Sequence, residues 1–271
     1  MKKKVLITVT TYPLPSGKYQ ELVCAGGFDE NREFIRIYPI PLSSLLRNRF
    51  RKYSWGELSL EKRDPKKDFR PNTFSPINKN LSDLKILAQV DTRNNWKERK
   101  EYCLNNVYTS MISLIEDAYK RNIYKSLAVF KPNKFISFII EKDERDWKPK
   151  WKEQIKQLCL FTGDEWKKIG IKKVPYKFYY RFLDDKGKES KLMVEDWEIS
   201  QLYWNCLKAS DGKEDIAIKK VKQKCWNDLA LQKDLHLFLG TTLQWHKRRS
   251  PNPFLIVGLF YPPKIHQKKL F

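Results

Sequence analysis

The sequence predicts an α+β protein made mainly of antiparallel β-hairpins or barrel-like sheets, decorated by amphipathic helices. Short β-branched and aromatic runs bounded by turn residues occur at both ends of the chain, as in VLITVTTY (5–12) and FLIVGLF (254–260). Strands and helices do not alternate in the sustained way that a parallel sheet requires, so we expect the strands to pair as hairpins.

The N-terminal elements are expected to be strands. Alternating or β-branched residues predict strands at 5–12, 34–38 and 53–63, and the segment 21–39 is expected to form a hairpin that turns at Asp29–Arg32. Residues 64–82 are rich in Pro, Asn, Asp and Ser and show no period, which indicates a loop.

Helices are expected further along the chain. Apolar residues at i, i+3 and i+4 spacing predict a helix over 97–120, and a shorter one is expected over 151–161. A strand is expected at 134–142, and a hairpin turning at Asp184–Gly187 precedes a helix whose N-cap is Asp196. The remaining expected elements are a helix over 214–232 and strands at 235–239 and 254–260.

We expect one integrated unit over residues 1–271, because no Gly/Ser linker and no internal repeat divides the chain. Within this unit we distinguish an N-terminal β part (1–92), a helical middle (93–170) and a C-terminal hairpin and helix part (171–271).

The composition narrows the class of protein. Of 271 residues, 41% are hydrophobic and 14% aromatic, which indicates a folded chain. No apolar run approaches the ~20 residues needed to cross a bilayer, and the start MKKKVLITVTTYPLP is expected to be a strand and not a signal peptide. The five cysteines form no CxxC pair, as expected for reduced thiols. We therefore expect a cytoplasmic protein without a membrane partner.

Motifs for cofactors or metals do not occur in the sequence. There is no phosphate-binding glycine motif, and the three histidines have neither HExxH nor i, i+4 spacing. We therefore expect no cofactor and no dedicated metal site.

The strongest signal is charge. The chain carries 54 Lys and Arg against 32 Asp and Glu, a net charge of +22. A folded chain this basic and this aromatic is typical of proteins that bind nucleic acid, and we expect DNA before RNA. The alternative is a lysine-rich composition inherited from an AT-rich genome.

Two segments combine cations with aromatic rings, which together can grip phosphates and stack on bases. One is RNRFRKYSW (47–55), and the other is the loop LGTTLQWHKRRSPNP (239–253), whose His246 is also expected to face a site. The alternative is a solvated basic face. The residues expected to bind nucleic acid are Arg47, Arg49, Arg51, Lys52, Trp245, Lys247, Arg248 and Arg249.

Two Tyr-Pro strand ends should lie close together in the first hairpin region, in TTYPLPSGKY and IRIYPIP. They could build an aromatic slot for a base from Tyr12, Tyr19, Arg36 and Tyr38. The alternative is that proline only terminates two edge strands.

The segment VEDWE (194–198) places Glu195, Asp196 and Glu198 at a junction between a strand and a helix. A carboxylate there could face a pocket and, with His246, act as an acid–base pair in cleaving a glycosidic bond. The alternative is helix capping and compensation of the helix dipole. The first hypothesis is therefore a metal-independent, glycosylase-like hydrolase that excises a flipped base, either modified or unmodified.

Two other functions stay open from the sequence. One is a non-catalytic reader of modified DNA or RNA. The other is a metal-dependent nuclease, because Asp184 and Asp185 precede Glu189 and Lys191 across a turn, in the order that restriction-type nucleases use.

Several segments resemble an uncharacterised family of bacterial proteins. They are YPLPSGKYQELVCAGG, RIYPIP, PYKFYYRF, VEDWE with LYWNCL, and FLGTT with NPFLIVGLF, and together they span nearly the whole chain. The resemblance implies one integrated unit and a place beside anti-phage genes, and hence a role in antiviral defence. It implies no catalytic residue.

Overall fold

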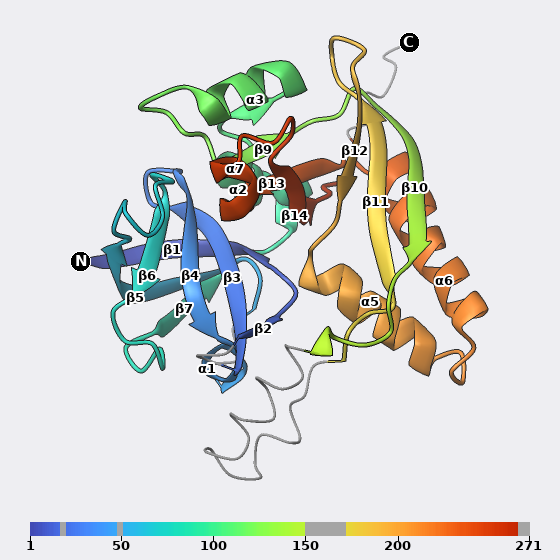
Figure 1. Cartoon of the computed structure of the whole chain (residues 1–271), viewed down its shortest axis with the longest axis horizontal. Coiled ribbons are helices and arrows are strands. Elements are labelled where there is room, and N and C mark those ends of the chain that lie inside the picture. Colours follow the sequence, from blue (N-terminus) through green and yellow to red (C-terminus); the bar gives the residue numbers. More distant parts are fainter. Residues whose placement is uncertain (17–19, 48–50, 150–171, 265–271) are drawn as a thin grey trace.

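The computed structural model describes residues 1–16, 20–47, 51–149 and 172–264. Its N-terminal half is a closed five-stranded β-barrel (Figure 1). Around the barrel the strand order is β1 (Lys2–Thr10), β3 (Gln20–Asp29), β4 (Phe34–Pro41), β6 (Thr73–Pro76) and β5 (Ser54–Lys62), and β5 pairs with β1 to close it.

This barrel has the topology of an OB-fold. In chain order its strands neighbour one another as first, second, third, fifth and fourth, and the pairing of β4 with β6 is parallel whereas the others are antiparallel. The short helix α1 (Leu42–Arg47) lies between the third and fourth strands. Two short strands, β2 (Leu14–Ser16) and β7 (Lys85–Gln89), extend the sheet at β3 and β5. In OB-folds, ligands bind across the second and third strands, between the loop that follows the first strand and the loop that precedes the fifth.

The barrel closes around its own apolar core, which includes Val5, Ile7, Ile35, Ile37 and Leu60. Alternation in β5 buries every second residue, as a strand with one buried face requires. The strands β1 and β3 approach closely at Gly27, where a Cβ atom would lie 2.1 Å from the backbone oxygen of Leu6. Only glycine fits there without a backbone shift.

The C-terminal half contains two further sheets. One has the order β14 (Phe254–Phe260), β13 (His236–Thr241), β9 (Leu127–Phe130) and β8 (Val107–Tyr108). The other has the order β10 (Lys134–Lys142), β11 (Tyr176–Leu183) and β12 (Glu189–Met193). Figure 1 shows α5 (Trp197–Lys208) and α6 (Glu214–Lys222) packed beside the second sheet; the remaining helices of the described residues are α2 (Arg93–Cys103), α3 (Met111–Tyr119), the π-helix η2 (Gln223–Leu231) and α7 (Leu243–Lys247).

The outer face of the barrel packs against the β13–β14 sheet through a shared aromatic core. The ring of Phe28 stacks on Phe34 at 4.6 Å, and both rings contact Phe238, at 5.9 and 5.6 Å between centroids. Phe260 adds a further ring to this cluster. Burial of several large aromatic side chains makes this contact a substantial part of the hydrophobic stabilisation.

The structure confirms the predicted α+β class with antiparallel sheets and a barrel. It also confirms the turns at Asp29–Arg32 and Asp184–Gly187 and the N-cap at Asp196. No helix among the described residues is long and apolar enough to cross a membrane.

Three local expectations were wrong. The helix expected over 97–120 is divided, because Val107 and Tyr108 pair with β9 and Ser110 caps a new helix with its side chain. The expected loop 64–82 contains β6, which completes the barrel, and the expected loop after β13 contains α7. The helix expected at 151–161 lies outside the described residues.

Candidate functional site

A cavity of about 270 Å³ lies between the barrel and the β13–β14 sheet. Its barrel side is formed by the end of β1, by β3 and β4, and by the loop between β5 and β6. Its other side is formed by Leu127, Glu195, the end of β13 and β14. The cavity therefore occupies the surface on which OB-folds bind their ligands, and the C-terminal half covers it.

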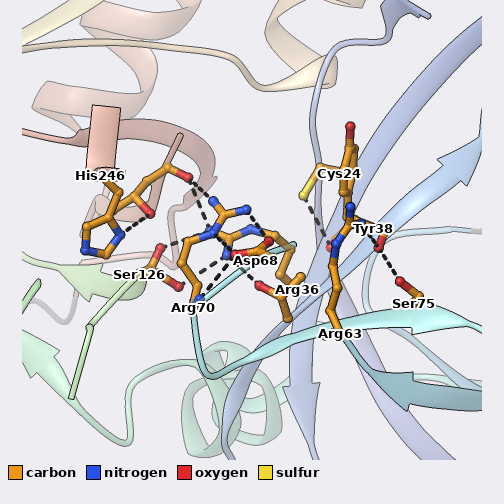
Figure 2. A network of polar contacts seen from close by, with 12 residues as sticks. Cys24, Arg36, Tyr38, Arg63, Asp68, Arg70, Ser75, Ser126 and His246 are labelled. Carbon is orange, nitrogen blue, oxygen red and sulfur yellow. Dashed lines mark hydrogen bonds and ion pairs between the residues drawn. The ribbon is translucent and has the colours of Figure 1, made fainter. Parts of the chain in front are cut away.

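Arg36 projects from β4 into this region and is 4% exposed (Figure 2). Its Nη1 donates to the hydroxyls of Thr73 and Ser126, both at 3.2 Å, and its Nη2 donates to the backbone oxygens of Ser126 and Thr241 at 3.0 and 3.4 Å. All of these acceptors are neutral. Burial, together with the charge of Arg70, lowers the pKa of Arg36 to about 10, so the side chain is still cationic near neutral pH.

Arg70 and Asp68 form a buried, bidentate ion pair in the loop between β5 and β6. Arg70 Nε and Nη2 donate to the two carboxylate oxygens of Asp68 at 2.8 and 2.6 Å, and Nη1 donates to the backbone oxygen of Thr241 at 2.7 Å. Burial raises the pKa of Asp68, but the hydrogen bonds and charge of Arg70 outweigh it, so the pKa lies below its usual value. Asp68 is thus ionised and fully engaged by Arg70.

Arg63 lines the cavity beside Tyr38. Its Nη1 donates to the backbone oxygen of Tyr38 at 3.1 Å, and its guanidinium carbon lies 5.2 Å from the centre of the Tyr38 ring. Its Nε–H is buried and has no acceptor among the described residues. A buried donor without an acceptor is costly, and other atoms of the Arg63 side chain line the cavity.

Glu195 is a carboxyl group of the cavity that no described side chain or backbone group engages. The backbone holds the residue in place, because its N–H donates to Ile256 at 2.8 Å and its C=O accepts from Tyr12 at 3.1 Å. Burial raises the pKa of Glu195, which favours the uncharged carboxylic acid.

The electrostatics of the cavity favour an anion. Three arginines line it, against Asp68 and Glu195. Asp68 is committed to Arg70, and Glu195 carries a raised pKa. The cavity thus combines net positive charge with two aromatic rings, those of Phe34 and Tyr38, one free carboxyl group and apolar walls. This combination is typical of sites that orient a small polar ligand.

Residues 107–271 match the family model described as Domain of unknown function (DUF8757). The chain belongs to this family. A second model, Domain of unknown function (DUF8758), matches residues 1–105, which contain the barrel. No curated protein matches the chain. The cavity takes residues from both regions. The prediction of one integrated unit, made from the absence of a linker or repeat, stays a prediction.

The structure brings only part of the predicted base pocket together. Arg36 and Tyr38 line the cavity. Tyr12 lines a neighbouring cavity of about 150 Å³ instead, where its hydroxyl donates to the backbone oxygen of Lys172 at 2.5 Å. Tyr19 lies outside the described residues. Glu195 lines both cavities.

The predicted catalytic carboxylates do not line the main cavity. Asp196 is 1% exposed, and its Oδ1 accepts from the backbone N–H of Glu198 at 2.8 Å as the N-cap of α5. Lys52 Nζ lies 3.3 Å from Asp196 and 2.7 Å from Glu198. Burial raises the pKa of Asp196 more than the Lys52 charge lowers it. In the structure Asp196 therefore caps helix α5, as the alternative interpretation expected.

His246 does not form an acid–base pair with Asp196. It is 2% exposed within α7, its Nδ1 contacts the hydroxyl of Thr241 at 3.2 Å, and its Nε2 contacts the backbone oxygen of Ala118 at 2.6 Å. Burial lowers its pKa, which favours the neutral imidazole. Because both ring nitrogens make hydrogen bonds to protein groups, His246 has a structural role: it links the end of β13 to the end of α3.

The predicted phosphate-contacting residues fall into three groups. The prediction that Lys52 contacts phosphate is wrong, because its side chain is only 12% exposed and forms ion pairs with two carboxylates. Arg49 and the Arg47 side chain lie outside the described part of the chain. The exposed members are Arg51, Trp245, Lys247, Arg248 and Arg249.

The four residues of the nuclease hypothesis do not converge. Asp184 accepts from backbone N–H groups of its own turn and from Met111, and Asp185 contacts a threonine hydroxyl. Glu189 pairs with an arginine and Lys191 with a glutamate on neighbouring strands. Across the described ranges, no three His, Cys, Asp or Glu side chains are grouped to hold a metal ion.

Three charged cavity residues were missed by sequence reasoning: Arg63, Asp68 and Arg70. They stand within the segment RDPKKDFRP, most of which was interpreted only as a loop. The spacing of Asp68 and Arg70, two residues apart and just before a strand, is the signal that could have indicated a loop held by an ion pair. Glu195 was noted at the junction beside Asp196 and Glu198, but it was not selected as a catalytic residue.

Proposed function

We propose that the protein binds nucleic acid across the barrel face and receives one flipped nucleotide in the cavity. The observation that carries this proposal is the position of the cavity on β3 and β4, between the loop after β1 and the loop before β6. Nucleic acids and oligosaccharides bind OB-folds at this surface, and a net charge of +22 favours the nucleic acid.

The cavity has room for one base and not for a stack. Its volume is about 270 Å³, and the C-terminal half closes it on the side away from the barrel. A base must therefore leave its neighbours to enter, as in enzymes and readers that extrude a nucleotide. The exposed Trp245 and the cations Lys247, Arg248 and Arg249 lie on the helix and turn that follow the cavity-lining Thr242, where they can hold the flanking strand.

Base excision is the activity that fits these groups best. The carboxyl group in the cavity that is not paired with an arginine belongs to Glu195, which replaces Asp196 and Glu198 as the acid of the glycosylase-like hypothesis. Water would add to the sugar carbon as the glycosidic bond breaks, and an acid with a raised pKa can supply the proton that the leaving base needs. The alternative is a protein that binds modified DNA or RNA without catalysis. We also propose that the protein acts in antiviral defence.

Fluorescence tests the binding step. A DNA strand containing 2-aminopurine should become brighter on binding, because the base leaves the stack, and affinity should fall steeply with salt. The Arg63→Gln variant should bind the strand about tenfold more weakly, or extrude the base about tenfold less. This is the size expected for the loss of a hydrogen bond to a charged group. Lys134→Gln, which removes one exposed cation that does not line the cavity, is the control.

The activity step needs a second assay. Phage DNA with and without modified bases is incubated with the protein, with and without EDTA. Abasic sites that form in EDTA support base excision, binding without product supports the reader, and EDTA-sensitive breaks support a nuclease. Binding that ignores salt and leaves 2-aminopurine stacked would overturn the proposal itself.

A further inference from the structure

Among the described residues, two groups of the cavity lack hydrogen-bond partners, and they differ in chemistry. The buried Nε–H of Arg63 has no acceptor there, and Glu195 is bonded only through its backbone, so its carboxyl group has no partner there either. The other polar groups that face this region are satisfied: Arg36 by hydroxyls and carbonyls, and Arg70 by Asp68 and Thr241.

We propose that the cavity is a two-ended site for a single free nucleotide, in which Arg63 binds the anionic group and Glu195 hydrogen-bonds to the edge of the base. The ligand class rests on the proposed function, but the site would bind the mononucleotide without any strand.

The base end follows from how Glu195 is held. Its backbone is fixed on one side by β14 and on the other by the segment after β1, which places the residue at the wall of the cavity. Burial raises its pKa and no cation of the cavity counters this effect. A carboxylic acid presents one donor beside one acceptor. This pattern complements a base edge with a donor beside an acceptor, such as the amino group and ring nitrogen of adenine.

The anionic end follows from the arginines. Arg63 comes from the end of β5 and Glu195 from the segment between β12 and α5, so the two groups enter the cavity from different halves of the molecule. Arg36 carries its charge without a carboxylate in contact among the described residues, so the arginine end retains a positive potential. A phosphate fits this end because guanidinium groups bind phosphate oxygens with charge-assisted hydrogen bonds.

A matched pair of substitutions tests whether Glu195 binds the base as a neutral carboxylic acid. Glu195→Gln keeps one donor and one acceptor in the same shape, whereas Glu195→Ala removes both. If the acid reads the base edge, glutamine should replace glutamate. If Glu195 acted as an ionised carboxylate, which only accepts, glutamine should fail as alanine does.

Calorimetry with four probes tests the site: AMP, adenosine, purine riboside 5′-monophosphate and inorganic phosphate. We expect AMP to bind best, with a loss of about tenfold when either the phosphate or the amino group is removed. Arg63→Gln should abolish the difference between AMP and adenosine. Glu195→Ala should abolish the difference between AMP and purine riboside monophosphate, and Glu195→Gln should retain it.

Equal binding of AMP and purine riboside monophosphate to the unaltered protein would overturn the role of Glu195. Loss of that difference in Glu195→Gln would overturn the donor–acceptor assignment. Circular dichroism of each variant establishes that it is folded. If no mononucleotide binds while a 2-aminopurine strand is still extruded, this inference fails and the proposed function stands; if neither binds, both fail.

Discussion

The ion pair between the two halves of the molecule gives a stability test with a calculable size. Lys52 comes from the barrel region, and Asp196 and Glu198 belong to the start of α5. The perturbation is Lys52→Met, which keeps the apolar stem and removes the charge. Asp196 is 1% exposed, so its carboxylate would stay buried without a cation.

The expected loss of unfolding free energy is about 3 kcal/mol. Removing one partner of a fully buried pair costs about 3–5 kcal/mol. We place the value at about the lower limit because the backbone N–H of Glu198 and the helix N-terminus still stabilise the Asp196 carboxylate. The contact between Lys52 and Glu198 adds about 0–1 kcal/mol, since Glu198 is 53% exposed.

Asp196→Asn should cost less, about 1–2 kcal/mol, because asparagine caps a helix as well as aspartate and Lys52 keeps Glu198 as a partner. The double variant leaves no uncompensated buried charge at this position. Its loss should therefore be smaller than the sum of the single losses by at least about 1 kcal/mol.

Urea unfolding followed by tryptophan fluorescence measures each value, with the slope m checked for constancy. The exposed pair Lys191–Glu141 supplies the control, and Lys191→Met should change stability by less than about 1 kcal/mol. A Lys52→Met variant within about 0.5 kcal/mol of the unaltered protein, or additive single and double variants, would refute the reasoning.

Two further predictions concern the barrel and the buried imidazole. Gly27→Ala should lower stability by at least about 3 kcal/mol, since its Cβ would collide with the Leu6 backbone oxygen, and a small shift of the urea midpoint would contradict this. His246 has a pKa below its usual 6.5, so the unfolded chain binds its proton first and stability falls as pH drops through 6.5 towards the folded-state pKa. His246→Gln should therefore reduce the loss between pH 6.5 and 5.5 by up to about 1 kcal/mol, and an unchanged pH dependence would exclude His246 as its source.

Local patterns predicted the hairpins because a hairpin needs only neighbouring residues. The alternation around Asp29–Arg32 placed Arg36 and Tyr38 correctly on one strand, and both line the cavity. The closure of the barrel was not predictable in this way. It depends on the parallel pairing of Arg36 with Thr73, which joins strands separated by a segment without period.

The division of the helix expected at 97–120 has a related cause. Val107 and Tyr108 face the protein interior as a short strand, and their spacing also fits a helical stripe. Apolar periodicity reports which residues are buried, and it does not distinguish a kinked path from a continuous helix. The Ser110 side chain, which accepts from Ser113, is the local feature that indicated a new start.

The carboxylate of the site was misplaced by one residue. Asp196 was chosen because an aspartate before a helix is recognisable, and the structure uses it as the cap. Glu195 is bonded through its backbone to β14 and lines the cavity, whereas Asp196 turns to Lys52. Which of two adjacent carboxyl groups faces a cavity depends on strand pairing far away in the sequence.

The buried charges explain why the site needs both halves of the chain. Arg36 and Arg70 from the barrel region both donate to the backbone oxygen of Thr241, at the end of β13. Without the C-terminal half, these guanidinium groups would lose an acceptor and the apolar cover that makes the cavity. Without the barrel, the oxygen of Thr241 would lose both cations. A site of this kind cannot be assembled gradually from either region, because each half alone would carry an exposed aromatic face and unsatisfied polar groups. The cavity therefore depends on both regions being joined in one chain. We expect the function of the protein to depend on this cavity between the regions and not on the barrel alone.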